Sequence, residues 1–517
     1  TSLNHEEDDQ EINEPQSDIN PIHKSSRTRR APDRMCLYID AEEHGLGDLG
    51  EPANYKAALL DPESKKSLHA MNVEIQSMKD NDVWVLVELP PNARTVGSKW
   101  LFKKKTDMDG AVYIFKARLV AKGFTQTYGV DYEETFSPVV DIRAIRILIA
   151  IAAYYDYEIW KTDVKTAFLM EHLFEKVYME QPEGFVNPKY PNHVCKLKRS
   201  IYGLKQASRQ CNKRFDDEIK KFGFTQNLDE PCVYIKASGS YIAILILYVD
   251  DILLMGNNIS MLQDVKSYLR RSFAMKDLGE AVYILRIKIY RDRSKRLIGL
   301  CQKAYIENIL KRFYKENSKR GMIPMHEKLK LSKSQGASTP AEKQRMQNIP
   351  YASAVGSIMY AVRCTRPDVA FAQNMTSRLQ QNPSNMEREL RVSCYTDAGY
   401  LTDMLNISPL LMSKEAVWIR KFISGRGIVP IIEEPISMYC DNTGAIAIAK
   451  DDGVTKGARH FRTKVHYLRE TIKLGDVKIE KIHTNDNLAN PFTKALAFPK
   501  HSELTRNIGL LPASSFM

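Results

Sequence analysis

The sequence predicts a mixed α+β protein built from short buried strands and longer amphipathic helices. Strands are indicated by brief apolar runs that end in turn residues. In 241–258 an Ile- and Leu-rich run stops at two adjacent aspartates and then resumes. Helices are indicated by apolar residues at helical spacing, as in 141–155 and 303–314. The 517 residues, 43% hydrophobic and 27% charged, give room for roughly three globular domains.

Charge and cysteine usage narrow the class of protein. A net charge of +12 predicts a polyanionic partner, either nucleic acid or an anionic membrane surface. No apolar run approaches the roughly 18 residues of a membrane span, and the acidic, polar N-terminus is unlike a signal peptide. The eight cysteines form no Cys-x-x-Cys pair. This favours reduced, mostly buried thiols in an intracellular protein and argues against a zinc ribbon or knuckle.

Residues 1–50 are expected to be a disordered linker. Seven acids among residues 6–18 precede five basic residues among 24–34, and such charge blocks bury too little apolar surface to fold. Residues 45–50 match the dinucleotide-binding pattern Gly-x-Gly-x-x-Gly, but the strand and helix that the pattern needs around it are missing, so we interpret it as a chance loop. Since the chain starts at Thr1 and not at Met, we expect it to be a piece of a longer protein.

A basic β-hairpin is predicted at 99–124, after a helix at 53–78 and a strand at 83–89. The hairpin carries seven Lys or Arg residues against two Asp, with aromatic residues between them. Basic strands with interleaved aromatics suit contacts to phosphates and bases. A solvated sheet face is the alternative interpretation of the same pattern.

Three aspartates stand at the ends of apolar strands. Asp163 closes the strand predicted at 157–164, just before an expected helix start, and Asp250 and Asp251 occupy the tip of the hairpin in 241–258. Adjacent carboxylates between apolar strands are costly, because each raises the pKa of the other and both lose water. Mg²⁺ ions held together with substrate phosphates would offset that cost. An ordinary solvated turn is the other possibility.

If these strands are neighbours, the three carboxylates converge and can hold two Mg²⁺ ions. One ion would lower the pKa of a primer 3′-hydroxyl, and the other would stabilise the leaving pyrophosphate. Such polymerase chemistry needs no nucleophilic side chain from the protein. The basic residues would supply positive charge for a template.

The later part of the chain repeats the theme of acids at strand ends. The elements expected there are a turn and basic helix at 196–222, helices at 266–273, 303–314 and 351–374, a polar linker at 328–347, and strands at 392–397, 436–442 and 477–483. The three strands place Asp397, Asp441 and His483 at or near their ends. This arrangement would be a second metal-dependent nuclease site if a third and a fourth acid existed, and such acids are not obvious.

Five motifs occur in order along the chain: Lys116-Ala-Arg-Leu-Val-Ala-Lys-Gly-Phe124, Glu134-Thr-Phe-Ser-Pro-Val139, Asp163-Val-Lys-Thr-Ala-Phe-Leu169, Tyr202-Gly-Leu-Lys-Gln206 and Tyr248-Val-Asp-Asp251. Any one of them is a weak signal, but five in register are highly specific. From about residue 51 to residue 517 the chain resembles the reverse transcriptase of a copia-type LTR retrotransposon Pol polyprotein.

The resemblance implies a right-hand polymerase fold of fingers, palm and thumb, followed by a truncated α/β ribonuclease H-like domain. Five regions are therefore expected: the linker at 1–50, fingers and palm at 51–255, the end of the palm and thumb-like helices at 256–327, a basic linker or shortened connection at 328–390, and a truncated ribonuclease H-like remnant at 391–517.

The resemblance also implies roles for individual residues. Asp163, Asp250 and Asp251 match the metal-binding catalytic triad, and the main chain of Val164 would be a further ligand. Phe168 matches the bulky gate beside the sugar 2′ position. The remaining nucleotide contacts would come from Arg118 and Lys105 in the fingers and from Lys205 and Gln206 in the loop that flanks the incoming nucleotide.

Departures from the family pattern in the polymerase region concern stability more than chemistry. Met170-Glu171 replace Asn-Gly at a turn, and Cys211 replaces a Trp in a helix, which loses aromatic volume. Leu285-Arg286-Ile287 replaces Leu-Gly-Ile and places a charge where a small residue is expected. None of these changes alters a metal ligand.

The ribonuclease H-like region departs further. Asp397 and Asp441 match two of its four acids, with His483 nearby. The segment with the catalytic Glu is expected to be deleted within 403–413, and the final acid is replaced by Asn490. Losing two of four metal ligands should abolish two-metal hydrolysis, so no ribonuclease H activity is expected. A sheet that lacks strands also exposes apolar edges, so this region is not expected to fold well.

These features predict an RNA-directed DNA polymerase that uses two Mg²⁺ or Mn²⁺ ions and deoxynucleoside triphosphates. The expected partners are an RNA template, a DNA primer or RNA–DNA hybrid, and other parts of the Pol polyprotein, with no membrane. The expected setting is the cytoplasm, in a virus-like particle, or the nucleus. The alternative is a decayed polyprotein relic that binds nucleic acid without turnover. The intact triad favours the enzyme, and the truncated C-terminal region favours the relic.

Overall fold

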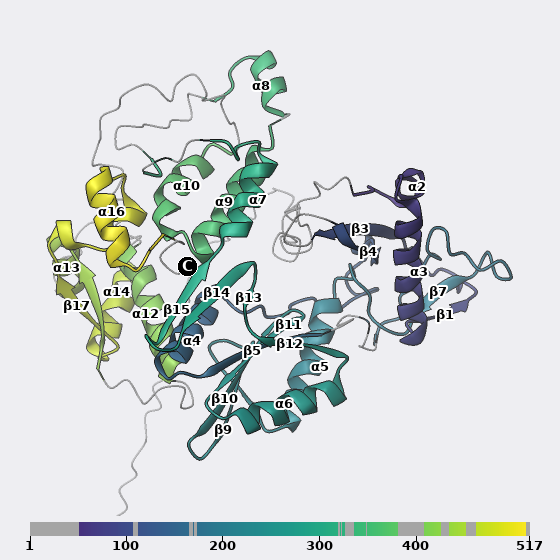
Figure 1. Cartoon of the computed structure of the whole chain (residues 1–517), viewed down its shortest axis with the longest axis horizontal. Coiled ribbons are helices and arrows are strands. Elements are labelled where there is room, and N and C mark those ends of the chain that lie inside the picture. Colours follow the sequence, from purple (N-terminus) through teal and green to yellow (C-terminus); the bar gives the residue numbers. More distant parts are fainter. Residues whose placement is uncertain are drawn as a thin grey trace, which may run out of the picture. The chain divides into compact units, whose positions relative to one another are not determined.

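The computed structural model describes the greater part of the chain, all of it within Gly47–Met517 (Figure 1). The described residues are 51–106, 112–164, 169, 173–318, 321, 323–325, 336–347, 349–380, 408–424, 434–450 and 462–512, except for the side chains of 105–106, 113, 408–412, 424, 448 and 462–465. The expected linker at 1–50 lies outside the described residues.

A small four-stranded sheet and two helices form the first part of the described chain. The strand order is β1 (Trp84–Val87), β7 (Val194–Leu197), β6 (Tyr178–Met179) and β2 (Thr95–Val96). The single helix predicted at 53–78 is wrong in one respect, because the structure has two helices, α2 (Tyr55–Leu60) and α3 (Ser64–Asp80). Pro62 separates them, since proline removes a backbone donor and its ring clashes with the preceding turn of a continuous helix.

The predicted basic hairpin is confirmed as the antiparallel pair β3 (Ser98–Thr106) and β4 (Val112–Ala121). Its turn at 107–111 lies outside the described residues. On β4 the alternate residues Ala117, Leu119 and Ala121 are buried in a cluster that α3 helps to form. Because side chains alternate along a strand, Lys116 and Arg118 face the other way. A 3₁₀ turn, η1 (Gly123–Thr125), follows β4.

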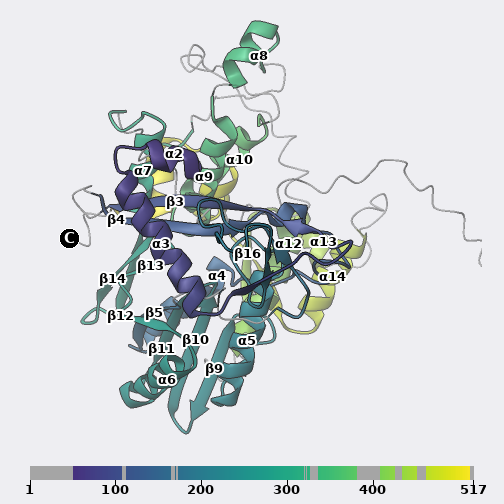
Figure 2. The ribbon, with the colours of Figure 1, turned by 90° about the vertical axis from the view of Figure 1, so that its right-hand side faces the viewer.

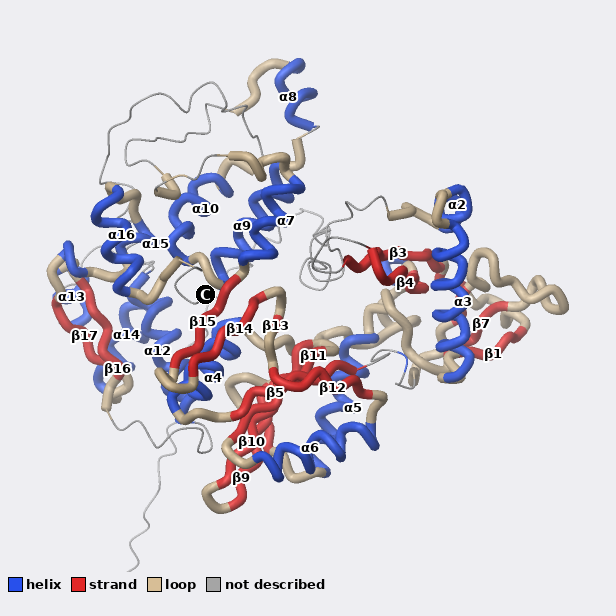
Figure 3. Tube along the Cα trace, in the orientation of Figure 1, coloured by secondary structure: helices blue, strands red, loops and turns tan. Residues whose placement is uncertain are grey.

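A six-stranded sheet forms the centre of the molecule, in red below the middle of Figure 3. Its strands, in spatial order, are β12 (Met275–Glu280), β5 (Glu158–Val164), β11 (Asp251–Gly256), β10 (Tyr241–Tyr248), β9 (Val233–Ser238) and β8 (Thr225–Gln226). The predicted strand at 157–164 and the predicted hairpin in 241–258 are therefore confirmed, and they lie side by side in this sheet.

Helices cover both faces of the central sheet, which explains the unbroken apolar run in β10. Ile244 and Ile246 enter a cluster with α4 (Ile142–Tyr154), whereas Leu245 and Leu247 enter a second cluster. The second cluster includes residues of α5 (Ala207–Lys221) and α6 (Ile259–Ser272), which run beside β9 and β10 in Figure 2. A strand with both faces covered needs apolar residues at every position.

Helix α6 begins earlier than the expected helix at 266–273. Its N-cap is Asn258, whose side-chain oxygen accepts a hydrogen bond of 2.8 Å from the backbone N–H of Met261. Such a cap satisfies one of the donors that the first helical turn leaves open. The cap, and not the apolar spacing, sets where this helix starts.

A three-stranded antiparallel sheet and several helices follow the central sheet. The strands are β13 (Tyr283–Ile284), β14 (Ile287–Asp292) and β15 (Leu297–Cys301), and the helices are α7 (Lys303–Arg312), α8 (Pro340–Gln347), α9 (Tyr351–Cys364), the 3₁₀ turn η4 (Pro367–Val369) and α10 (Ala370–Ser377). The helices predicted at 303–314 and 351–374 are confirmed, the latter with a short interruption at Thr365-Arg366.

Helix α8 lies within the region that was expected to be a linker at 328–347. The oxygen Oε2 of Glu342 accepts hydrogen bonds from the N–H groups of Ser338 (2.9 Å) and Thr339 (3.1 Å), and Thr339 Oγ1 accepts one from the N–H of Glu342 (3.2 Å). This reciprocal capping box, with Pro340 as the first helical residue, starts a helix in a polar sequence that has little apolar pattern.

The C-terminal part contains helices around a pair of parallel strands, β16 (Ile436–Cys440) and β17 (Val477–Lys481). The accompanying elements are α12 (Ser408–Ser424), α13 (Thr443–Lys450), α14 (Arg462–Lys473), the 3₁₀ turn η8 (Thr484–Asp486), α15 (Asn490–Thr493) and α16 (Phe498–Asn507). The strands predicted at 436–442 and 477–483 are confirmed, and the one predicted at 392–397 lies outside the described residues.

Two general expectations can be compared with the described part of the chain. None of its helices has both the length and the apolar character that crossing a bilayer requires. The six cysteines in it are all free thiols, of which Cys195, Cys232 and Cys364 are buried. Burial raises the pKa of the Cys195 thiol to about 12, which favours the protonated thiol over the nucleophilic thiolate.

Candidate active site

The two aspartates of the central hairpin lie at its turn, as predicted. Tyr248 and Asp251 are the last paired residues of β10 and β11, so Val249 and Asp250 form the two-residue turn. Val249 has a positive φ of 55°, at a turn position that usually holds glycine. A β-branched residue there is strained by roughly 1–3 kcal/mol. The Val249 side chain packs against a cluster that includes Tyr202, which helps to hold this conformation.

Strand β5 brings Asp163 next to this turn. Asp163 is the register partner of Asp251 across the antiparallel pair of β5 and β11, and the next residue, Val164, donates its N–H to the carbonyl oxygen of Asp250 at 2.9 Å. On the other side of β5, Lys276 of β12 is paired with Asp163. Residues directly opposite on neighbouring strands point to the same face, so the Asp163 and Asp251 side chains share one face of the sheet.

The Asp251 carboxylate is held by a lysine that the sequence analysis did not single out. Lys161 Nζ lies 2.8 Å from Asp251 Oδ2, and both side chains are largely buried, with 16% and 22% of their surface exposed. Burial raises the pKa of Asp251, the Lys161 ammonium opposes that shift, and the neighbouring carboxylates of Asp250 and Asp163 add to it. Lys161 stands two residues before Asp163 on the same strand, and this period-2 spacing was the signal that could have revealed it.

The three aspartates suit a divalent cation by donor type, and they lie near one another. Hard cations such as Mg²⁺ prefer carboxylate oxygens, and Asp250 and Asp163 lie close enough to Asp251 to affect its pKa. Within the described ranges, however, no three carboxylate, imidazole or thiolate groups are gathered closely enough to hold a metal ion as they stand. A cation that binds the Asp251 carboxylate would take the place of the Lys161 ammonium, which now pairs with it.

Arg118, the expected triphosphate contact, lies on β4 next to the loop that carries Lys205 and Gln206. Its guanidinium carbon is 4.5 Å from the centre of the Tyr202 ring, within cation–π distance. The N–H of Ala121, at the end of the same strand, donates to the carbonyl oxygen of Tyr202 at 2.8 Å. Sequence motifs far apart along the chain therefore meet here.

Gly203 allows this close contact between strand and loop. It has a positive φ of 89°, and a Cβ added to it would lie 2.2 Å from the carbonyl oxygen of Ala121. No side chain fits in that space, so only glycine permits this approach of the two backbones. This close approach explains why the Tyr-Gly-Leu-Lys-Gln motif has glycine at its second position.

Gln206 and Lys205 bind a second loop through Gln126, which the sequence analysis missed. The fully buried Gln206 amide accepts from Gln126 Nε2 (3.1 Å) and donates to the Asp131 carbonyl (2.9 Å). Gln126 Oε1 accepts the backbone N–H of Lys205 (2.8 Å). Lys205 Nζ donates to the Gln126 carbonyl (3.0 Å) and to the Tyr132 hydroxyl (3.1 Å). Nothing in the spacing of the sequence marked Gln126.

Several predicted site residues lie outside the description. Phe168 and Asp397 fall in ranges that the structure does not describe, and Lys105 lies at the end of β3 without a described side chain. Their expected roles stay predictions. Val164 is buried, with 7% of its surface exposed, and its N–H is used in the bond to Asp250, so only its carbonyl group could serve as a ligand.

The C-terminal part brings two of its predicted residues to one edge of β16 and β17. Because these strands are parallel and Cys440 pairs with Lys481, Asp441 and His483 follow the same ends. Asp441 faces Lys494 Nζ at 3.9 Å, and His483 Nδ1 accepts the N–H of Asn485 at 3.3 Å as the cap of η8.

Asn490, which was expected to replace the final acid, makes a structural contact. It is buried, with 4% of its surface exposed, and its side-chain nitrogen donates to the carbonyl oxygen of Thr484 at 2.6 Å. A neutral amide can make this bond, whereas an ionised carboxylate there would face a carbonyl oxygen.

Comparisons with known proteins agree with the motifs. Residues 81–327 match a family model described as reverse transcriptase (RNA-dependent DNA polymerase). The Pol polyprotein from transposon TNT 1-94 of Nicotiana tabacum is 36% identical over 95% of this chain and 41% of its own length. That from transposon RE1 of Arabidopsis thaliana is 30% identical over 89% of this chain and 34% of its own length. The chain thus spans well under half of either polyprotein.

A shorter relative is covered more fully. A putative transposon Ty5-1 protein of Saccharomyces cerevisiae is 30% identical, and the match covers 44% of this chain and 71% of that protein. The family model, these relatives and the five ordered motifs all identify the same group of proteins. The chain therefore belongs to the reverse transcriptase family of copia-type retrotransposon Pol polyproteins.

Proposed function

We propose that this chain is an RNA-directed DNA polymerase, which extends a DNA primer on an RNA template with deoxynucleoside triphosphates. The observation that carries the proposal is the pairing of Asp163 with Asp251 across adjacent strands, with Asp250 in the turn beside them. Three aspartates from two distant parts of the chain thereby lie at one end of a sheet. Membership of the reverse transcriptase family supports the same activity.

Asp163, Asp250 and Asp251, with the carbonyl oxygen of Val164, would hold two Mg²⁺ or Mn²⁺ ions. Bound there, such ions would lower the pKa of the primer 3′-hydroxyl and offset negative charge on the triphosphate. Lys161 would balance the charge of Asp251 when no cation is bound, because it is the cation that now contacts this carboxylate. The hydrogen bond from Val164 to the Asp250 carbonyl would keep the turn against β5.

The nucleotide would lie between the basic hairpin and the loop at 202–206. Arg118 and Lys105 would contact the triphosphate, and Phe168 would exclude the ribose 2′-hydroxyl. Lys205 and Gln206 would shape the pocket wall, a role that fits the buried amide pair of Gln206 and Gln126. The +12 charge of the chain would hold the template and primer electrostatically.

In this proposal the regions take the names of a right hand. Fingers and palm would span 51–255, the end of the palm and thumb-like helices 256–327, a shortened connection 328–390 and a ribonuclease H-like remnant 391–517. The RNA template, the DNA primer and other parts of the Pol polyprotein would be the partners. The polymerase would work in a cytoplasmic virus-like particle or in the nucleus.

We also propose that the remnant has no ribonuclease H activity. Asp441 is the one acid of the expected set that lies within the described residues, and it faces Lys494. Asn490 makes a buried hydrogen bond that suits an amide, and it cannot supply a charged metal ligand. Cutting of the RNA strand in an RNA–DNA hybrid by the wild-type protein, abolished in Asp441→Asn, would contradict this.

Primer extension tests the polymerase. The full chain is given a poly(rA)–oligo(dT) primer–template, dTTP and a titration of Mg²⁺ or Mn²⁺. Incorporation should fall by a factor of roughly 10³ or more in Asp250→Asn, because a metal ligand is lost. The matched control is Asp264→Asn, which makes the same chemical change at an exposed position of α6 and should leave incorporation unchanged.

The same assay separates the enzyme from the relic. A wild-type chain that binds the primer–template in a filter assay yet incorporates no nucleotide with either metal would refute the polymerase. It would leave the decayed polyprotein, a basic nucleic-acid binder, as the better description.

A further inference from the structure

Helix α12 belongs to two hydrophobic cores at once. Ala416 and Val417 join Val477 in the small core of the C-terminal strands. Phe422, which has no exposed surface, joins the core behind the central sheet, where Trp418 also packs. The helix therefore ties the C-terminal part of the chain to the sheet that carries the three aspartates.

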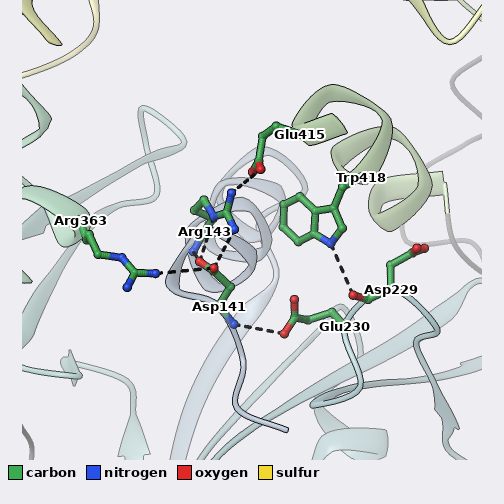
Figure 4. Close-up of polar contacts among 7 residues, drawn as sticks. All are labelled: Asp141, Arg143, Asp229, Glu230, Arg363, Glu415 and Trp418. Carbon is green, nitrogen blue, oxygen red and sulfur yellow. Dashed lines mark hydrogen bonds and ion pairs between the residues drawn. The ribbon is translucent and has the colours of Figure 1, made fainter. Parts of the chain in front are cut away.

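An aromatic and charged stack forms the contact with the central part. The rings of Trp418 and Phe422 are parallel within 2°, with centroids 5.3 Å apart. The guanidinium carbon of Arg143 lies 5.3 Å from the Trp418 ring, and Glu415 makes an ion pair with Arg143 (Figure 4). Glu415, Trp418 and Phe422 stand at positions i, i+3 and i+7 of α12, which places all three on one side of the helix.

The surface that receives α12 is held by its own hydrogen bonds. Asp141 caps α4 by accepting the N–H of Arg143 (2.9 Å), and its carboxylate accepts from Arg143 Nε (3.0 Å) and one terminal nitrogen (2.8 Å). The Asp141 N–H donates to Glu230 (3.1 Å), as Figure 4 shows. The hydrogen bonds that orient the Arg143 side chain thus come from Asp141, which lies outside α12.

The neighbouring turn completes this surface. Asn227 Oδ1 accepts the N–H groups of Asp229 and Glu230, each at 2.9 Å, and the Asp229 carbonyl accepts the Trp418 indole N–H at 3.4 Å. The seat is therefore made by the first turn of α4 and the turn at 227–230. The Asp229 carbonyl accepts the indole N–H of Trp418, and Arg143 contacts both the Trp418 ring and the Glu415 carboxylate. The Phe422 ring packs in the apolar core behind the central sheet.

We propose that α12 acts as a built-in brace of the catalytic sheet, docked in this seat through the pattern Glu415, Trp418 and Phe422. The C-terminal part, although its set of nuclease acids is incomplete, is then retained as a structural partner of the polymerase. The seat recognises an amphipathic helix that presents an acid and two aromatic side chains at this spacing. This inference concerns stability and does not rest on catalytic activity.

Hydrogen exchange on the full chain tests the brace. In Phe422→Ala we expect the backbone amides of α4 (142–154) and of β9 to β11 (233–256) to exchange roughly a hundredfold faster, because a fully buried ring is lost from their core. Tyr439→Ala is the matched control, since this aromatic residue in the same C-terminal part is 58% exposed. It should leave exchange at 142–154 unchanged.

A second pair of variants, which perturbs the fold less, separates loss of the contact between α12 and α4 from general misfolding. Glu415→Arg places a second cation beside Arg143 and should speed exchange at 142–154 several-fold. In an Arg143→Leu background the same change should have almost no effect there, because the coupling between the two side chains is gone. Equal effects of Glu415→Arg in both backgrounds, or wild-type exchange at 142–154 in Phe422→Ala, would overturn the proposal.

Discussion

The hairpin turn between β13 and β14 offers a prediction that can be worked through in detail. Leu285 and Arg286 form this two-residue turn and have positive φ values of 50° and 59°. Two consecutive positive φ values define the turn type that favours Asn-Gly, and related proteins were expected to have glycine at the second position. We predict that Arg286→Gly stabilises the protein.

The magnitude follows from three contributions. A side chain other than glycine in this conformation costs about 1–2 kcal/mol. Against this gain, the variant loses the contact of the Arg286 guanidinium with the Tyr305 ring, 5.8 Å from its centroid, worth about 0.5 kcal/mol at such a distance. Glycine also gains freedom in the unfolded chain. The net increase in the free energy of unfolding should be about 0.5 kcal/mol.

Two matched variants isolate the cause. Arg286→Ala loses the same cation–π contact but keeps a Cβ, so it should be less stable than Arg286→Gly by about 1 kcal/mol. Leu285→Gly relieves similar strain but removes a leucine that is 6% exposed, so it should be less stable than the wild type by about 1–3 kcal/mol.

Equilibrium urea unfolding measures these differences as shifts of the midpoint at an unchanged slope. The reasoning predicts the order of stability Arg286→Gly, then wild type, then Leu285→Gly. If Arg286→Ala is as stable as Arg286→Gly, the positive φ carries no cost and the explanation of this turn is refuted.

Three further predictions concern groups near the site and the seat. Burial raises the pKa of Glu230 to about 7 from an ordinary 4.5, so the folded state holds a proton that the unfolded state has released. As pH rises from 4.5 to 7 the wild type should therefore lose up to about 3 kcal/mol of stability relative to Glu230→Gln, and equal midpoints of the two proteins at pH 5 and pH 8 would contradict this. Burial raises the pKa of Asp251 and Lys161 opposes that shift, so Lys161→Gln should move the acid limb of the pH profile of primer extension to higher pH; an unmoved limb would show that Lys161 does not control this carboxyl. Gln126→Leu leaves Gln206 Oε1 and the backbone N–H of Lys205 without the hydrogen bonds that Gln126 makes to them, at a cost of about 1–3 kcal/mol. It should raise the KM for dTTP more than it lowers kcat; a change in kcat alone would argue against a positioning role.

Much of the central sheet could be predicted from local pattern. A strand that is buried on both faces is apolar at every position, so its apolar run can be recognised in the sequence. The predicted strands at 157–164 and in 241–258 agree closely with the observed bounds. The sequence does not predict that these two strands pair with each other. Two segments separated by a whole helix and several strands meet through packing, which local spacing does not encode.

Helix boundaries were less predictable, because caps and not apolar spacing set them. Asn258 starts α6 about two turns before the expected position. Glu342 with Thr339 starts α8 in a stretch whose composition predicts a linker. Pro62 splits the first predicted helix. Each of these signals was present in the sequence as a capping residue or a proline, and each acts through backbone hydrogen bonds of a few residues.

The candidate site shows the same division. The motifs identify Asp163, Asp250 and Asp251, whereas the roles of Lys161 and Gln126 depend on contacts with residues of other elements. The position of Lys161, two residues before Asp163, places it on the same face of the strand and can be derived from the spacing. Nothing in the spacing marks Gln126.

The sequence by itself determined which chemical groups this protein has, among them three strand-end carboxylates and a basic hairpin. Only the tertiary structure decided where these groups lie relative to one another. It set Asp163 opposite Asp251, gave Asp251 a lysine partner, and seated Trp418 on Arg143. Spacing along a chain fixes the face of one helix or strand, whereas contacts between distant elements depend on how all their apolar faces are buried together.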